Sequence, residues 1–91
     1  MPQIEADPEE LASFAVHLRD YCDGLEEEMR RIKSRFDDLR DRWKGEDADR
    51  VQAEFDQIHR PLVQHIENCR DLVAFLAKKA HDLDEWIRRY H

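Results

Sequence analysis

The chain has 91 residues, of which 41% are charged, and its 22 acidic and 15 basic side chains give a formal net charge of −7. One small domain is expected at this length. The acidic balance argues against a nucleic-acid binder and against anchoring on anionic lipid, and no apolar run approaches the roughly 20 residues of a membrane span. The N-terminus lacks the apolar core of a signal peptide, so export would need another route.

The distribution of helix-breaking residues predicts an all-α fold. The sequence has only 2 glycines and 3 prolines. Apolar residues do not alternate at a period of two over any useful length, which excludes a strand-rich fold, and the high charge content is typical of long helices.

A first helix is predicted over about residues 8–43. Asp7 can cap it, Pro8 suits its first position, and Glu10 can close a capping box. Apolar residues then recur at alternating spacings of three and four, which is the pattern of a helix that packs along a single partner. Gly45 is expected to end this helix as a left-handed cap. The row consists of Leu11, Ala15, Leu18, Cys22, Leu25, Met29, Ile32, Phe36, Leu39 and Trp43.

A second helix is predicted over about residues 47–89, with a kink near Pro61, which lacks a backbone donor. His65 and Lys79 are polar interruptions of its row, where buried polar residues can set register, and Lys79 is expected to extend its ammonium to water. Ile66, Val73, Ala80 and Ile87 form a second row beside it. The main row consists of Ala48, Val51, Phe55, Ile58, Leu62, His65, Cys69, Leu72, Leu76, Lys79, Leu83, Trp86 and Tyr90.

The turn at residues 43–45 is too short for any arrangement but an antiparallel hairpin, in which facing residue numbers sum to about 91. Trp43 then faces Ala48, and Cys22 faces Cys69. Surplus apolar residues remain at the open end, away from the turn, and they predict a partner surface that two hairpins would cover by forming a four-helix bundle dimer. Alternatively, some of them broaden the core of a single hairpin. The set is Phe14, Val16, Tyr21, Ile66, Val73, Phe75, Ala80 and Ile87.

The chain resembles the WXG family, the small ESAT-like proteins of type VII (ESX-type) secretion systems. The residues that carry the resemblance are Trp43-Lys44-Gly45 between two amphipathic helices, the opening Asp7-Pro8-Glu9-Glu10-Leu11, and Phe55 after the turn. A bare W-x-G is a weak motif, but at the turn of a hairpin of this length it is fairly specific. The resemblance covers nearly the whole chain.

The resemblance implies a helical hairpin that pairs into a homodimer or heterodimer. Such proteins are exported without a cleaved signal peptide, or they accompany larger effectors to a secretion ATPase. The family's export signal, a Tyr-x-x-x-Asp/Glu motif after the second helix, has no counterpart here, because Tyr90 is followed only by His91. A partner would then carry the signal, or this protein is a non-exported targeting partner, or the sequence is shortened.

Catalysis has little support, because the sequence has no glycine-rich phosphate loop and no G-x-S-x-G, and its carboxylates suit solvated helix faces. We therefore expect a non-enzymatic protein without a cofactor. Cys22 and Cys69 face one another in the predicted register and could form a disulfide worth about 4 kcal/mol, or remain buried free thiols.

Cys22, Glu26, His65 and Cys69 could also converge as zinc-type ligands, although a hydrogen bond between His65 and Glu26 is the simpler expectation. His17, His59, His81 and His91 are expected at the surface.

Two functions follow from these observations. The first is a WXG-type protein, cytoplasmic before export, that acts as a dimeric secreted substrate or escorts a larger effector by binding its helical N-terminal region. The second is an intracellular coiled-coil adaptor whose W-x-G arose by chance.

Overall fold

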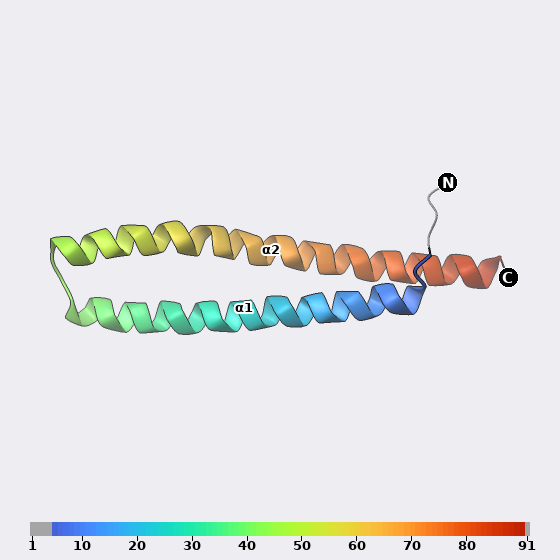
Figure 1. The fold of residues 1–91 in the computed structure, drawn as a ribbon, viewed down its shortest axis with the longest axis horizontal. Coiled ribbons are helices and arrows are strands. Elements are labelled where there is room, and N and C mark those ends of the chain that lie inside the picture. The colour runs from blue at the N-terminus through green and yellow to red at the C-terminus, as the bar shows by residue number, and fades with distance from the viewer. Residues whose placement is uncertain (1–4, 91) are drawn as a thin grey trace.

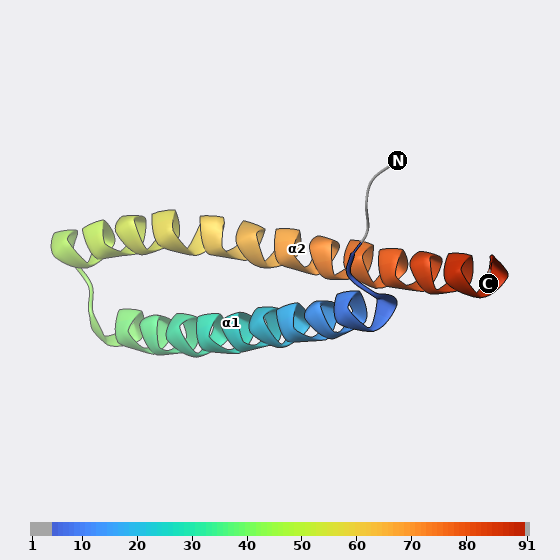
Figure 2. The ribbon, with the colours of Figure 1, turned by 45° about the vertical axis from the view of Figure 1, so that its right-hand side comes forward.

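The computed structural model describes residues 5–90, and within them it contains two α-helices and no strand. Helix α1 spans Pro8–Arg42 and helix α2 spans Glu46–Arg89. The two helices lie side by side and antiparallel, with the turn at one end of the molecule (Figures 1 and 2). The resulting rod measures 68 × 22 × 15 Å. His91 lies outside the described residues, so its expected exposure stays a prediction. Neither helix has an apolar stretch long enough to cross a membrane.

The start of α1 is fixed by its cap. The Asp7 side chain accepts a hydrogen bond from the Glu10 backbone amide at 2.8 Å, and Pro8 occupies the first turn, where its missing donor costs nothing. Glu9 and Glu10 in that turn also complement the positive end of the helix dipole.

The turn differs from the prediction in the role of Gly45. Helix α1 ends at Arg42, and Trp43, which follows it, already has an extended backbone (φ −129°, ψ 110°). Gly45 instead precedes the first turn of α2, with φ 116° and ψ −179°. This conformation is strained for a residue with a Cβ, so the glycine reverses the chain and starts α2 rather than capping α1 from a left-handed position.

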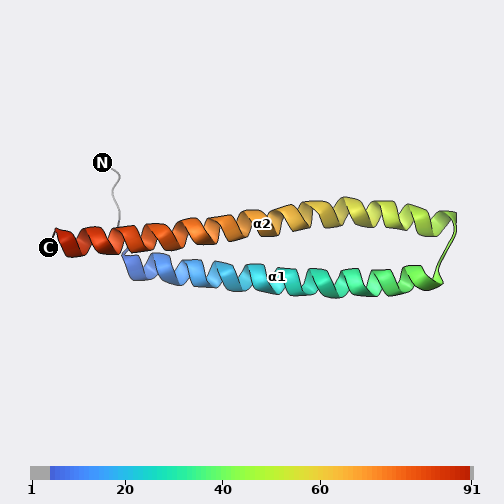
Figure 3. The same ribbon diagram turned by 180° about the vertical axis from the view of Figure 1, so that it is seen from behind.

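Helix α2 continues through Pro61 without interruption. Its ribbon changes direction gently in the yellow part, near residue 60, as Figures 1 and 3 show from opposite sides. A missing backbone donor inside a helix produces such a bend.

The packing of the two helices follows the antiparallel register. Phe36 and Phe55 stack across the interface with their ring centroids 4.4 Å apart. Ala48, next to the turn, is fully buried, and Ala15 and Cys22 are buried further along α1. We call the residues that face the other helix the seam.

The seam of α2 differs from the predicted row at every second position, where the next residue along the chain faces α1 instead. The helix is therefore rotated about its axis relative to the prediction. Ile66 and Ala80 are each 5% exposed, whereas Val51, Ile58, Leu72 and Trp86 are exposed. The predicted positions and the observed ones both recur every seven residues next to Phe55 and Cys69. Apolar character alone therefore did not show which of the two sets faces α1. The rotation removes the polar His65 and Lys79 from the seam and replaces them with Ile66 and Ala80. In the turn half, it brings in Gln52 and His59, both half-buried.

The seam of α1 also departs from the predicted row in its turn half. Ile32 and Leu39 are exposed, whereas Lys33 and Arg40 are half-buried. An α-helix has 3.6 residues per turn, so a strict seven-residue repeat drifts around an unsupercoiled helix. The apolar stems of Lys33 and Arg40 can fill the seam while their charged ends reach water.

Candidate functional site

Most exposed large apolar side chains gather on one side of the hairpin, which we call the apolar flank. On α2, Val51, Ile58, Leu72 and Trp86 fall one position before seam residues at multiples of seven, and Phe75 follows Leu72 by three residues. On α1 its members are separated by 7, 11 and 7 residues. Because each residue turns an α-helix by 100°, these separations return each side chain to nearly the same direction around the helix axis. The apolar flank consists of Phe14, Tyr21, Ile32, Leu39, Val51, Ile58, Leu72, Phe75 and Trp86, which are between 38% and 69% exposed.

Contacts between the helices place the two rows on the same side. The Tyr21 hydroxyl lies 3.2 Å from Nε2 of His65, which belongs to the α2 row. The two rings meet edge to face, with their centroids 6.1 Å apart. Tyr21 and His65 therefore bridge α1 and α2 along the apolar flank, which runs over most of the rod.

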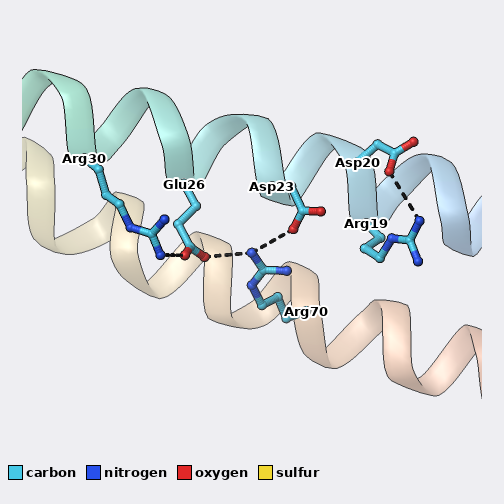
Figure 4. Close-up of polar contacts among 6 residues, drawn as sticks. All are labelled: Arg19, Asp20, Asp23, Glu26, Arg30 and Arg70. Atoms are coloured by element: carbon cyan, nitrogen blue, oxygen red, sulfur yellow. Dashed lines mark hydrogen bonds and ion pairs between the residues drawn. The ribbon is translucent and has the colours of Figure 1, made fainter.

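The opposite side, which we call the ion-pair flank, is charged. The Arg70 guanidinium of α2 donates to Glu26 of α1 at 2.7 Å and contacts Asp23 at 3.0 Å, and Arg30 pairs with Glu26 along α1 (Figure 4). Nearer the turn, Arg40 reaches across to Asp49 at 2.9 Å. The helices are thus joined by ion pairs on this flank.

The cluster around Arg70 shifts the acidity of its members. The hydrogen bond from Arg70 lowers the pKa of Glu26 below its ordinary value, and the charge of Arg30 adds to the effect. Hydrogen bonds to Glu26 and Asp23 raise the pKa of Arg70. The ionised carboxylate of Glu26 is therefore the form that pairs with Arg70 across the two helices.

The residues predicted to form a partner surface at the open end are partly exposed and partly buried in the hairpin's own core. Phe14, Val16, Tyr21 and Phe75 are exposed. The prediction was wrong for Ile66 and Ala80, because both are buried against α1 in the hairpin's own core. Val73 and Ile87 are half-buried. Sequence reasoning missed Ile32, Leu39, Val51, Ile58, Leu72 and Trp86, because it had placed all of them in the seam.

Val16 stands apart from the apolar flank. It lines a shallow groove of about 540 Å³ on the ion-pair side of the open end. Alanines and Val73 contribute apolar surface to this groove, and charged side chains such as Glu9, Arg19 and Arg88 also line it.

Both cysteines are buried in the core, and both are free thiols. Cys22 is fully buried and Cys69 is 8% exposed. Burial, together with a hydrogen bond to Cys69, raises the pKa of the Cys22 thiol. The Cys69 sulfur lies 3.6 Å from Nε2 of His65.

The four-residue metal set does not form. Glu26 is engaged by Arg70 on the ion-pair flank, whereas His65 contacts Tyr21 on the apolar flank. The expected hydrogen bond between His65 and Glu26 is absent for the same reason. Across residues 5–90, no group of three or more His, Cys, Asp or Glu side chains is placed to hold a metal ion.

Two other polar residues of α2, His59 and Lys79, lie against aromatic rings. His59, expected at the surface, is half-buried in the seam and stacks on Phe55, with ring centroids 5.6 Å apart. Lys79 is exposed and holds its ammonium 5.3 Å from the centroid of the Phe75 ring.

The Trp43-Lys44-Gly45 motif forms the turn itself. Trp43 is half-buried, and the residue that faces it in the register, Ala48, is fully buried. Arg40 donates to the Trp43 carbonyl at 3.3 Å and also pairs with Asp49. One guanidinium thus ties the end of α1 to the start of α2, while Lys44 and Gly45 are exposed.

Comparison with known proteins agrees with this architecture. The model of the family WXG100, described as proteins of 100 residues with WXG, matches residues 3–86. Wild-type EsxB, a secreted protein from Bacillus anthracis, superposes with a TM-score of 0.82 at 22% identity, over 91% of this chain and 89% of that one.

A single-site mutant of the same EsxB gives a TM-score of 0.82 at 20% identity, over 99% of each chain. At this level of identity the likeness shows the fold alone. A search of curated proteins returns no match.

Proposed function

This chain belongs to the WXG100 family, and from that premise we propose that it is a non-enzymatic protein of a type VII secretion pathway. It acts as a secreted substrate or as the escort of a larger effector, and its activity is binding to a second helical hairpin. The partner is a second copy, another WXG-type hairpin, or the helical N-terminal region of the effector.

The apolar flank carries the proposal. It presents nine large apolar side chains along a rod of 68 Å, which is far more than the scattered apolar residues of a monomer surface. A hairpin that packs on this flank would complete a four-helix bundle and bury both sets. The ion-pair flank remains in water in that arrangement, so pairing uses one side of the hairpin.

Light scattering of the purified chain, alone and mixed with the hairpin encoded by a neighbouring gene, tests the binding. We expect a dimer in at least one of the two samples. Leu72→Glu should give a monomer, because it places a charge in the apolar flank. Val16→Glu is the matched control, since Val16 is 44% exposed and Leu72 is 47% exposed, but Val16 lies outside that flank. A monomeric wild-type chain in both samples would contradict the proposal.

Secretion is tested separately. Deleting the type VII ATPase gene in the source bacterium should remove this protein, or the effector that it escorts, from the culture medium. Unchanged secretion of both would show that the pathway is a different one.

A further inference from the structure

We propose that Cys22 and Cys69 form a redox-sensitive lock, which closes into an intramolecular disulfide by exchange with a low-molecular-weight disulfide. Tyr21 and His65 are the positioning residues of this site. The lock goes beyond the proposed function and does not rest on it, because it depends only on groups within one hairpin.

The fold places the two cysteines opposite each other in the seam. Cys22 and Cys69 face each other in the antiparallel register, and both side chains are buried between the helices. A disulfide requires this kind of juxtaposition, because its bond geometry is narrow. Both side chains belong to helices fixed by neighbouring contacts, such as the Arg70 ion pairs with Asp23 and Glu26.

The two cysteines are not equivalent. Cys69 is 8% exposed and lies 3.6 Å from the His65 imidazole, which is exposed, whereas Cys22 has no exposed surface. Neutral imidazole can accept the thiol proton at Nε2, and its exposed ring can pass the proton to water. The Tyr21 hydroxyl, 3.2 Å from the same nitrogen, can donate or accept and so holds the ring in place.

These positions assign the order of the reaction. Cys69 loses its proton to His65, and its thiolate attacks one sulfur of the external disulfide, which releases one small thiolate and leaves a mixed disulfide. Cys22 then attacks the Cys69 sulfur, and its proton passes to the second small thiolate as that group leaves. The protein dithiol is oxidised, and the external disulfide is reduced to two thiols.

Closing the lock constrains the turn half of the molecule. The bond joins the two helices near their middles and encloses the chain from residue 22 to residue 69. It therefore prevents the turn-side halves of the helices from separating, and it leaves the open end free. Reducing compartments would keep the thiols free, and oxidising ones would close the lock.

The test uses the purified full chain, reduced first and then treated with oxidised glutathione under non-denaturing conditions. After alkylation, intact mass should show one unalkylated chain that has lost two hydrogens, with no glutathione attached. Tm should then rise by roughly 10 °C or more relative to the reduced chain. Persistent glutathione adducts, only intermolecular disulfides, or no reaction would each overturn the lock.

Variants test the roles of the residues. Cys22→Ser should stop the reaction at the mixed disulfide on Cys69. His65→Gln should slow closure several-fold while the final yield stays the same, and Tyr21→Phe should slow it less. His81→Gln is the control, because His81 is an exposed histidine of α2 that pairs with Glu85. Equal rates for His65→Gln and His81→Gln would remove the assigned role of His65. A monomeric result in light scattering would leave the disulfide result unaffected.

Discussion

At the scale of single residues, the two glycines have opposite roles, although a Cβ would meet no neighbouring atom within 4 Å at either. Gly45 adopts a φ of 116° that other residues rarely take, whereas Gly24 lies inside α1. Only the first position therefore needs glycine, and the reason is the backbone conformation of the turn.

Alanine substitutions should accordingly change stability in opposite directions. Gly45→Ala should lower the free energy of unfolding by about 1–3 kcal/mol, because alanine is strained there. Gly24→Ala should raise it by about 0.5–1 kcal/mol, because alanine is the better helix former. Urea unfolding measures both, and a shift of the same sign in the two variants would contradict this account.

Trp43 fills the turn end of the seam, but it is half-buried rather than enclosed. Trp43→Ala should therefore cost about 2–3 kcal/mol, which is less than a fully buried tryptophan would lose. Trp86→Ala is the control when both variants are made in a Leu72→Glu background, where assembly does not contribute, because Trp86 is exposed in the single hairpin and should change the free energy by no more than about 0.5 kcal/mol. An unchanged Tm for Trp43→Ala would instead make Trp43 a recognition residue at the turn.

Glu26 makes the hairpin sensitive to acid. Its pKa is lowered in the folded chain by Arg70, so its stabilising contribution is present above its ordinary value of 4.5 and is lost as pH falls through the lowered pKa. Glu26→Gln should reduce the loss of Tm between about pH 7 and about pH 3. Glu27→Gln, on the solvent face of α1, should keep the wild-type pH profile. Parallel profiles for all three proteins would show that the Arg70 cluster does not contribute.

At the scale of elements, the sequence predicts both helices, the antiparallel hairpin and the facing of Cys22 and Cys69. Cap residues, heptad spacing and a very short turn each carry a strong local signal. The rotation of α2 was not predictable from spacing, because two adjacent rows are both largely apolar. The outcome depends on tertiary packing along the whole helix, because Ile66 and Ala80 replace His65 and Lys79 in the open half while Gln52 and His59 replace Val51 and Ile58 in the turn half.

The rotation of α2 can be checked with two isoleucines of the same helix. Ile66 is 5% exposed and Ile58 is 69% exposed. In a Leu72→Glu background, where assembly does not contribute, Ile66→Ala should cost about 2–4 kcal/mol, and Ile58→Ala should stay within about 0.5 kcal/mol. Equal losses in thermal unfolding would favour the unrotated row.

At the scale of the whole molecule, a lone hairpin buries only one seam. The residues that are less than one-tenth exposed are mostly small, and Phe36 and Ile66 are the large ones among them. A partner on the apolar flank would add a second core. The proposed dimer therefore contributes to folding as well as to recognition.

This coupling predicts that thermal stability depends on protein concentration. If two copies pair, raising the concentration should raise Tm, because the associated state is favoured by mass action. Leu72→Glu should show no such dependence, and Val16→Glu should behave as the wild-type chain does. Circular dichroism over a hundredfold dilution measures the effect. A concentration-independent Tm in a chain that scatters as a dimer would contradict the coupling.

The separation of the apolar flank from the ion-pair flank also limits how far assembly can proceed. Two copies related by a twofold axis can each cover the other's apolar flank, and the same patch then serves both subunits. The resulting pair presents the ion-pair flanks outward, and the apolar side chains described there, such as Val16 and Val73, lie in a groove that charged side chains also line. The proposed pairing of two copies would thus close on itself rather than extend into an open-ended filament, even though each chain is a long rod.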